Sequence, residues 1–216
     1  MADARATRWR RRVAAIGWRG VLRKAFGDHV YRRSDSVVLE CRREWSRHAP
    51  PRASGDLTFL TLAAGDAIPP LCAWLAHRRA DFSAMHATGK LGLFVLRAGV
   101  AVGCAWIAFE DHHDPAAREH YRVAPGEAYH YCWLVDPVER TRGTTLAFAR
   151  HVLAVLAARG VTRQFGVVDR TNRASYRVLQ HFGYRECGIR VRHIYLLHRR
   201  WTRVAQYDGT LGLIAA

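Results

Sequence analysis

The sequence predicts a single α/β (α+β) domain, in which helices pack on a mixed β-sheet, preceded by a basic N-terminal helical arm. The 216 residues, half of them hydrophobic, suffice for one substantial core. Strand and helix patterns alternate after a predicted hairpin, an order that builds a mixed sheet covered by helices. Fourteen basic and only five acidic residues precede residue 53. We therefore predict an arm over residues 1–50 and a domain over residues 51–216.

The predicted arm contains a basic amphipathic helix over residues 5–27, weakened by Gly17 and Gly20. Two interpretations stay open. The apolar stripe of this helix packs on the domain, or the arm docks on an anionic membrane surface or an acidic carrier protein. The net charge of +16 is nearly all arginine, as biased codon usage also produces, so charge alone does not identify the partner.

The first half of the domain contains only short sequence patterns that indicate secondary structure. Alternating apolar residues predict strands, two prolines open a helix, and Gly99 marks a hairpin turn. In chain order we predict a strand over 36–40, a polar connection over 46–55, a strand over 57–62, a helix over 70–79, hairpin strands over 91–96 and 101–109, and a polar loop over 111–127.

The second half of the domain gives sharper signals, because longer periodic segments are separated by clear turn residues. The apolar residues of its first helix that can face the sheet are Leu146, Val152, Leu153 and Leu156. In chain order we predict a strand over 128–135, a turn over 136–142, a helix over 143–158, a strand over 161–168, a helix over 172–182, and a strand over 186–197.

The turn that opens the helix over 143–158 predicts a phosphate site. The first amides of a helix have no internal partner and lie at the positive end of its dipole, so a phosphate placed there gains hydrogen bonds and favourable charge. Gly143 lets a phosphate approach the main chain, which a side chain would block. The residues of this predicted site are Arg140, Thr141, Arg142, Gly143, Thr144 and Thr145.

Together with the next helix, these residues resemble the GCN5-related N-acetyltransferase (GNAT) superfamily. Its cofactor signature is Arg or Gln, two residues, Gly, one residue, and Gly or Ala, and Arg140, Gly143 and Thr145 occupy the three places. Thr145 departs from the signature, although its hydroxyl can itself donate to a phosphate oxygen. The later matching residues are Asn172, Gly183 and Tyr184, of which the first two also serve as ordinary helix caps.

The resemblance covers roughly residues 57–200 and implies a mostly antiparallel central sheet. It also implies acetyl-CoA or another acyl-CoA as donor, no metal, and a small-molecule or peptide amine that attacks the thioester directly. Because no covalent enzyme intermediate is required, we interpret Cys104 and Cys132 as buried strand residues. The cofactor-binding residues that the resemblance adds are Leu134 and Val135, through their backbone groups, and Asn172 and Ser175.

The proton donor is where this sequence departs most from the family. The family's usual tyrosine, seven residues after the helix-opening Asn, is Leu179 here. Tyr176 lies close to one helical turn away and is the candidate that replaces it. The alternatives are protonation through water or no acyl transfer at all.

Strand alternation supplies the candidates for a general base. Glu127, Tyr129, Tyr131 and Trp133 share one predicted face, and His130 lies on the other. The family's base positions correspond to Tyr129 and Tyr131, and neither is a base at neutral pH without a strongly lowered pKa. Glu127 or His130 can act instead through water, but His130 then needs a β-bulge to reach the same side. The predicted catalytic set is Glu127, Tyr129, Tyr131 and Tyr176.

Other patterns restrict the compartment and the cofactors. Five cysteines without a C-x-x-C pair disfavour disulfides and zinc, which places the chain in a reducing cytoplasm. The apolar runs are far shorter than the roughly 20 residues that span a bilayer. The cluster His112, His113, Asp114 and His120 fits no standard zinc spacing.

Three functions remain. The first is N-acyl transfer from acyl-CoA to an amine, and the second uses a donor on an acidic carrier protein or at a membrane, bound through the arm. The third is a catalytically inactive binding module, motivated by Leu179. Nucleic acid is disfavoured, since the basic residues come without an aromatic platform or a DNA-reading motif. A homodimer stays open.

Overall fold

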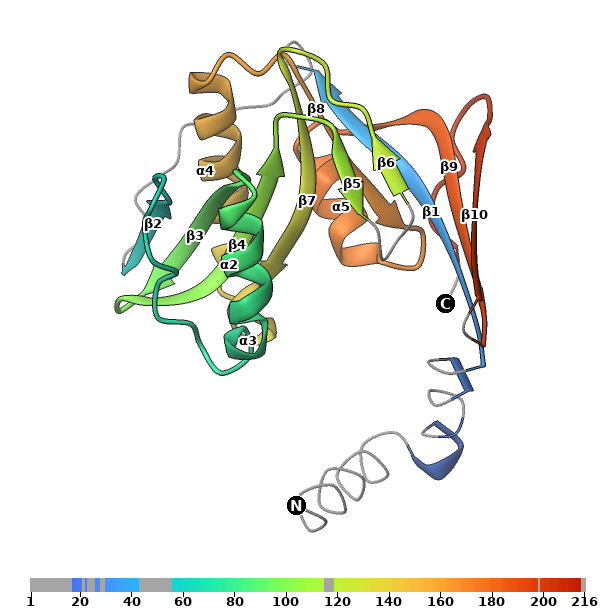
Figure 1. The fold of residues 1–216 in the computed structure, drawn as a ribbon, viewed down its shortest axis with the longest axis horizontal. Helices are drawn as coiled ribbons and strands as arrows, with labels where there is room; N and C mark the ends of the chain where they lie inside the picture. The colour runs from blue at the N-terminus through green and yellow to red at the C-terminus, as the bar shows by residue number, and fades with distance from the viewer. Residues whose placement is uncertain are drawn as a thin grey trace.

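The computed structural model describes residues 17–20, 22, 26–27, 30–42, 56–114, 119–197 and 199–214. Most of the predicted helix over 5–27 and all of the predicted connection over 46–55 lie outside these residues. Eight strands form one sheet in the order β10-β9-β1-β8-β7-β4-β3-β2, in which only β7 and β8 pair in parallel (Figure 1). The predicted fold class, a mixed and mostly antiparallel sheet flanked by helices, is confirmed.

The elements have these bounds. The strands of the large sheet are β1 (Tyr31–Arg42), β2 (Leu57–Thr61), β3 (Leu91–Arg97), β4 (Val100–Ala108), β7 (Glu127–Val135), β8 (Arg163–Asp169), β9 (Arg185–Leu196) and β10 (Arg199–Gln206). A separate hairpin consists of β5 (His112–Asp114) and β6 (Glu119–Tyr121). The helices are η2 (Ala76–Arg78), α2 (Arg79–Ala87), α3 (Pro137–Arg140), α4 (Thr144–Ala158) and α5 (Arg173–His181).

Strand β1 lies inside the sheet, between β9 and β8. It extends beyond the predicted strand over 36–40, and its residues Val37, Val38 and Leu39 are buried on both faces. Residues 31–42, which the predicted division assigns to the arm, therefore belong to the sheet of the domain.

Three other predicted elements differ from the structure. The helix predicted over 70–79 begins only at Arg79, because the main chain of Pro70 and Cys72 hydrogen-bonds to Ala101 and keeps that segment extended. The loop predicted over 111–127 contains the β5–β6 hairpin. Strand β10 was not predicted, since its exposed edge position requires little apolar alternation.

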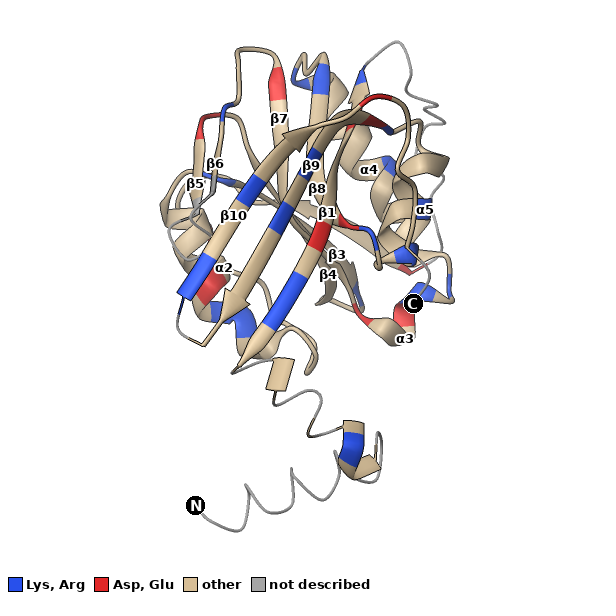
Figure 2. Cartoon of the chain, turned by 90° about the vertical axis from the view of Figure 1, so that its right-hand side faces the viewer, with Lys and Arg blue, Asp and Glu red and all other residues tan. Residues whose placement is uncertain are grey.

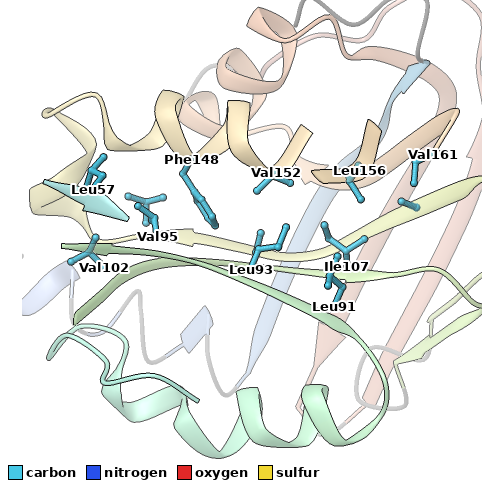
Figure 3. Packing of buried hydrophobic residues seen from close by; sticks show 13 residues of the cluster. Leu57, Leu91, Leu93, Val95, Val102, Ile107, Phe148, Val152, Leu156 and Val161 are labelled. Carbon is cyan, nitrogen blue, oxygen red and sulfur yellow. The ribbon is translucent and has the colours of Figure 1, made fainter. Parts of the chain in front are cut away.

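Two helices cover opposite faces of the sheet. Phe148, Val152 and Leu156 of α4 pack on one face (Figure 3). On the other face, Phe82 of α2 packs with Trp106. Leu146, which was predicted to face the sheet, is 36% exposed at the start of α4. Leu146 instead lines a cavity that α4 shares with α5.

Arginines gather on strands β1, β9 and β10 at one end of the sheet (Figure 2). Asp35 lies among them, accepts hydrogen bonds from Arg190 and forms an ion pair with Arg170. These arginine hydrogen bonds outweigh burial and lower the pKa of Asp35. Among the described residues, no helix is both long and apolar enough to cross a membrane.

Candidate active site

Strands β7 and β8 pair only at their beginnings and then separate. Their parallel register joins residues 127–130 to residues 163–166, where it ends. Beyond that point a cavity of about 630 Å³ opens between the strands and the first turns of α4 and α5. Of the predicted site residues, those that line it are Tyr131, Leu134, Val135, Arg140, Thr145, Asn172 and Ser175.

The strand register decides which main-chain groups face this cavity. The Asp136 amide donates to the Val102 carbonyl, so Gly103 and Val135 form a pair without mutual hydrogen bonds. The main-chain groups of Trp133 and Val135 therefore point away from β4, towards the cavity. Leu134 was predicted to use its backbone there, but its main chain pairs with β4, and it contributes its side chain instead.

The segment between β7 and α4 is shaped by two caps. Asp136 caps α3 by accepting a hydrogen bond from the Val138 amide at 3.0 Å. Gly143 caps α4 with a φ of 77°, a backbone angle that residues other than glycine rarely adopt. A Cβ built on Gly143 meets nothing within 4 Å, so backbone conformation, rather than close packing within the chain, is what requires glycine at this position.

A buried carboxylate, which sequence reasoning missed, holds this segment in place. Glu139 accepts hydrogen bonds from Arg97 at 2.9 Å, from the Thr144 hydroxyl at 2.9 Å and from Arg142 at 3.3 Å. Burial alone would raise the pKa of Glu139, but the bonds from Arg97 and Thr144 leave it below its ordinary value. The side chains of Arg142 and Thr144, predicted to bind cofactor, are thus engaged with Glu139, and Thr141 also lies outside the cavity wall.

Arg140 connects the end of β7 to a neighbouring segment. Its Nε donates to the Val135 carbonyl at 2.9 Å, and its guanidinium lies 5.7 Å from the ring centroid of Trp74. Such a stacked guanidinium has little freedom to move, so Arg140 presents a fixed positive charge at the cavity wall.

Three buried polar atoms in the cavity wall have no hydrogen-bond partner among the described residues. They are Nδ1 of His130, Nε1 of Trp133 and Oγ1 of Thr145. Buried polar atoms without partners cost free energy, and a ligand that enters the cavity can supply the missing partner. The chemistry of this wall fits a long ligand with hydrogen-bonding groups along its length.

A β-bulge at Tyr131 changes the predicted faces of β7. Trp106 pairs with Cys132, and the next residue of β4, Ile107, pairs with His130, which leaves Tyr131 as the extra residue. The prediction that Trp133 shares a face with Tyr131 is therefore wrong. Instead, the Trp133 ring stacks on the His130 ring with centroids 5.4 Å apart.

Two of the predicted bases lie outside the cavity wall. Glu127 accepts a hydrogen bond from Arg163 at 2.6 Å, and this contact outweighs burial and lowers the pKa of Glu127. Tyr129 is 6% exposed and packs against Phe165 and Tyr121. Of Glu127, Tyr129 and Tyr131, which were predicted to share one face of the strand, only Tyr131 is among the residues that line the cavity.

Tyr176 does not replace the missing donor at Leu179. It is 3% exposed and donates its hydroxyl to Glu186 at 2.6 Å, away from the cavity that Leu179 lines. Burial and the Glu186 carboxylate raise the pKa of Tyr176 to about 12. Cys104 is buried as predicted, and the half-buried Cys132 accepts a hydrogen bond from Arg78.

The histidine cluster lies on the hairpin β5–β6. The rings of His113 and His120 have centroids 6.4 Å apart, and His120 lies 3.3 Å from Asp111. His112 is buried, with its ring centroid 4.2 Å from that of Tyr131. This places His112 beside the bulge of β7.

Comparison with known proteins gives the family. The model of the Acetyltransferase (GNAT) family matches residues 60–184, more than half of the chain. The chain belongs to the GNAT family. A search of the curated proteins finds no match.

Solved structures agree on the fold. A Drosophila protein has a TM-score of 0.54 and 15% identity over 82% of this chain and 56% of its own. The glucosamine N-acetyltransferase region of a fungal multi-domain β-N-acetylglucosaminidase has a TM-score of 0.51 and 12% identity over 76% of this chain and 21% of its own. A GCN5-related N-acetyltransferase from Sphaerobacter thermophilus has a TM-score of 0.48 and 20% identity over 84% of this chain and 57% of its own. This chain thus spans only about half the length of the Drosophila and Sphaerobacter thermophilus proteins.

Proposed function

We propose that this chain transfers an acetyl or other acyl group from acyl-CoA to a small-molecule or peptide amine by direct attack. The observation that carries this proposal is the cavity between β7 and β8, whose wall contains three buried polar atoms in need of partners. Acyl-CoA is long, carries polar groups along its pantetheine arm, and ends in a reactive thioester. Those properties match the wall.

The first turn of α4 would bind the pyrophosphate. The helix begins its own hydrogen bonds at the amides of Leu146 and Ala147, which both donate to Gly143. The amides of Thr144 and Thr145 precede this point and have no acceptor within the helix. Together with the fixed charge of Arg140, they form an anion site at the positive end of the helix dipole.

The pantetheine arm would follow the open edge of β7. The inward main-chain groups of Trp133 and Val135 can pair with its amides as a strand would. The indole Nε1 of Trp133 adds a donor that lacks a partner among the described residues. The thioester would then lie near the bulge at Tyr131, where an acceptor amine reaches it.

Calorimetric titration with CoA tests the proposal. We expect micromolar binding to the wild type and at least about tenfold weaker binding to Gly143→Glu, because the carboxylate would occupy and repel the phosphate position. Gly160→Glu is the matched control. Gly160 lies at the other end of α4, also has a positive φ of 76°, and has equally open space at its Cβ.

Equal weakening in both variants would mean that the loss comes from backbone strain rather than from the phosphate site. Undiminished binding to Gly143→Glu, or no binding of CoA to the wild type, would overturn the proposal.

A second candidate changes only the carrier of the acyl group. The arginines on β1, β9 and β10 favour an acidic carrier protein as the donor's partner (Figure 2). Such docking predicts turnover that falls steeply with salt, and a share of the arm in the docking predicts that deleting residues 1–30 weakens this dependence. Turnover and salt dependence that survive the deletion unchanged would exclude docking through the arm.

A further inference from the structure

The inner end of the cavity, where β7 and β8 still pair, contains a buried tyrosine, histidine and glutamine in one hydrogen-bonded group. Nε2 of His130 lies 2.9 Å from the Tyr184 hydroxyl and 2.9 Å from Oε1 of Gln164. His130 and Tyr184 both line the cavity, and Tyr184 is 3% exposed. The three side chains come from β7, β8 and the turn after α5.

The hydrogen positions in this group follow from its acceptors. Oε1 of Gln164, as placed, only accepts, so Nε2 of His130 must carry the hydrogen that bridges them. The Tyr184 oxygen lies within hydrogen-bond distance of the same nitrogen. Burial lowers the pKa of His130 to about 4, which keeps the ring neutral with a single N–H. The Tyr184 hydroxyl hydrogen is therefore not needed for His130 and remains available to a ligand.

No other side chain of the described cavity wall is as well placed to protonate a leaving group at the inner end. Leu179 has no proton to give, and Thr145 and Ser175 belong to the first turns of α4 and α5, at the phosphate end. Tyr131 lies at the bulge, with its ring near His112 and Lys90 on the opposite side of the sheet.

We infer that Tyr184 is the proton donor to the leaving sulfur, in the role that Leu179 cannot fill, and that His130 positions its hydroxyl. This inference rests on the proposed function. As the carbon–sulfur bond of the thioester breaks, its electron pair stays on sulfur, and the Tyr184 proton moves to that sulfur. The proton that the attacking nitrogen loses restores the Tyr184 hydroxyl, so the reaction yields an amide and a thiol with no net change in the protein.

A pH titration of bound CoA tests the role of Tyr184 without an acceptor amine. The thiolate absorbs in the ultraviolet, so its pKa can be followed in the complex. A hydrogen bond from Tyr184 to the thiolate lowers that pKa, and we expect Tyr184→Phe to raise it by about one to two units. Tyr207→Phe is the matched control, because the Tyr207 hydroxyl donates to Glu186, outside the cavity wall.

Kinetics with acetyl-CoA and hydroxylamine as the probe amine give a second readout. Tyr184→Phe should lower kcat about 100-fold and leave KM for acetyl-CoA within about threefold. Adding Leu179→Tyr to that variant should restore at least a tenth of the lost rate, since position 179 lines the same cavity. If Tyr184→Phe fails to fold, ortho-fluorotyrosine can replace Tyr184 instead. In that variant, the alkaline limb of the pH profile of kcat should move to lower pH.

The outcomes separate the two proposals. CoA that fails to bind the wild type overturns the proposed function itself. CoA that binds with the same thiol pKa in the wild type and in Tyr184→Phe, or an alkaline limb that does not move with fluorotyrosine, overturns only the role of Tyr184.

Discussion

The two ends of the cavity are built in different ways. At the proposed phosphate end, residues 135–145 form one continuous stretch, in which amides at the start of α4 would bind the ligand. At the inner end, His130, Gln164 and Tyr184 come from three separate elements and act through side chains. The proposed binding would thus depend on residues close together in the chain, whereas the proposed proton transfer would depend on how distant segments fold together.

The two ends of the cavity also differ in the charge of their buried groups. The phosphate end is fixed by Glu139, a buried carboxylate surrounded by guanidinium groups. The inner end contains buried groups that must stay neutral, since no ion pair compensates them there. Acid should therefore destabilise both ends, the inner end as His130 gains a proton and the phosphate end, at lower pH, as Glu139 gains one.

The largest expected effect is the acid sensitivity caused by His130. Its folded pKa of about 4 lies below the ordinary value of 6.5, so between these values the unfolded chain binds a proton that the folded chain does not. Stability is therefore complete above pH 6.5 and falls as pH drops towards 4, by up to about 3 kcal/mol. Urea unfolding at pH 7 and at pH 4 measures this loss.

The variant His130→Gln isolates this effect, because glutamine keeps a donor for Gln164 but does not titrate. We expect the wild type to lose about 3 kcal/mol more than the variant between the two pH values. Equal losses would show that His130 titrates alike in the folded and the unfolded chain, so that burial does not lower its pKa.

A smaller effect is expected from Glu139→Gln at the phosphate end. Without its charge, the side chain holds Arg97, Arg142 and Thr144 less firmly, so the first turn of α4 must be ordered when ligand binds. We expect CoA affinity to fall about tenfold by calorimetry. The thiol pKa of bound CoA should not change, because the inner end is untouched.

Asp56→Asn is the control for this change, since Asp56 also pairs with Arg97 but is exposed. Its CoA affinity should match that of the wild type. A thiol pKa that moves in Glu139→Gln would show that the two ends of the cavity are coupled and do not act independently.

The contrast between the ends also explains what the sequence could predict. The signature residues Arg140 and Gly143 lie close together in the chain, and local helix chemistry identifies them without tertiary information. The anchor Glu139 could be missed because nothing local shows that Arg97 from β3 reaches it. Strict alternation of side chains along a strand cannot predict the bulge at Tyr131, so Trp133 was predicted to lie on the wrong face of the sheet.

The smallest expected effect distinguishes two roles of Asn172, which caps α5 by accepting from the Ser175 amide at 3.2 Å and also lines the cavity. Asn172→Ala should cost about 1 kcal/mol of stability in urea unfolding, as the loss of an N-cap does. Asn172→Asp keeps the cap but adds a negative charge beside an anionic ligand, so it should retain stability and bind CoA roughly threefold to tenfold more weakly. If Asn172→Asp binds CoA like the wild type, Asn172 serves only the helix. The phosphate end would then be built by α4 alone, without a contribution from α5.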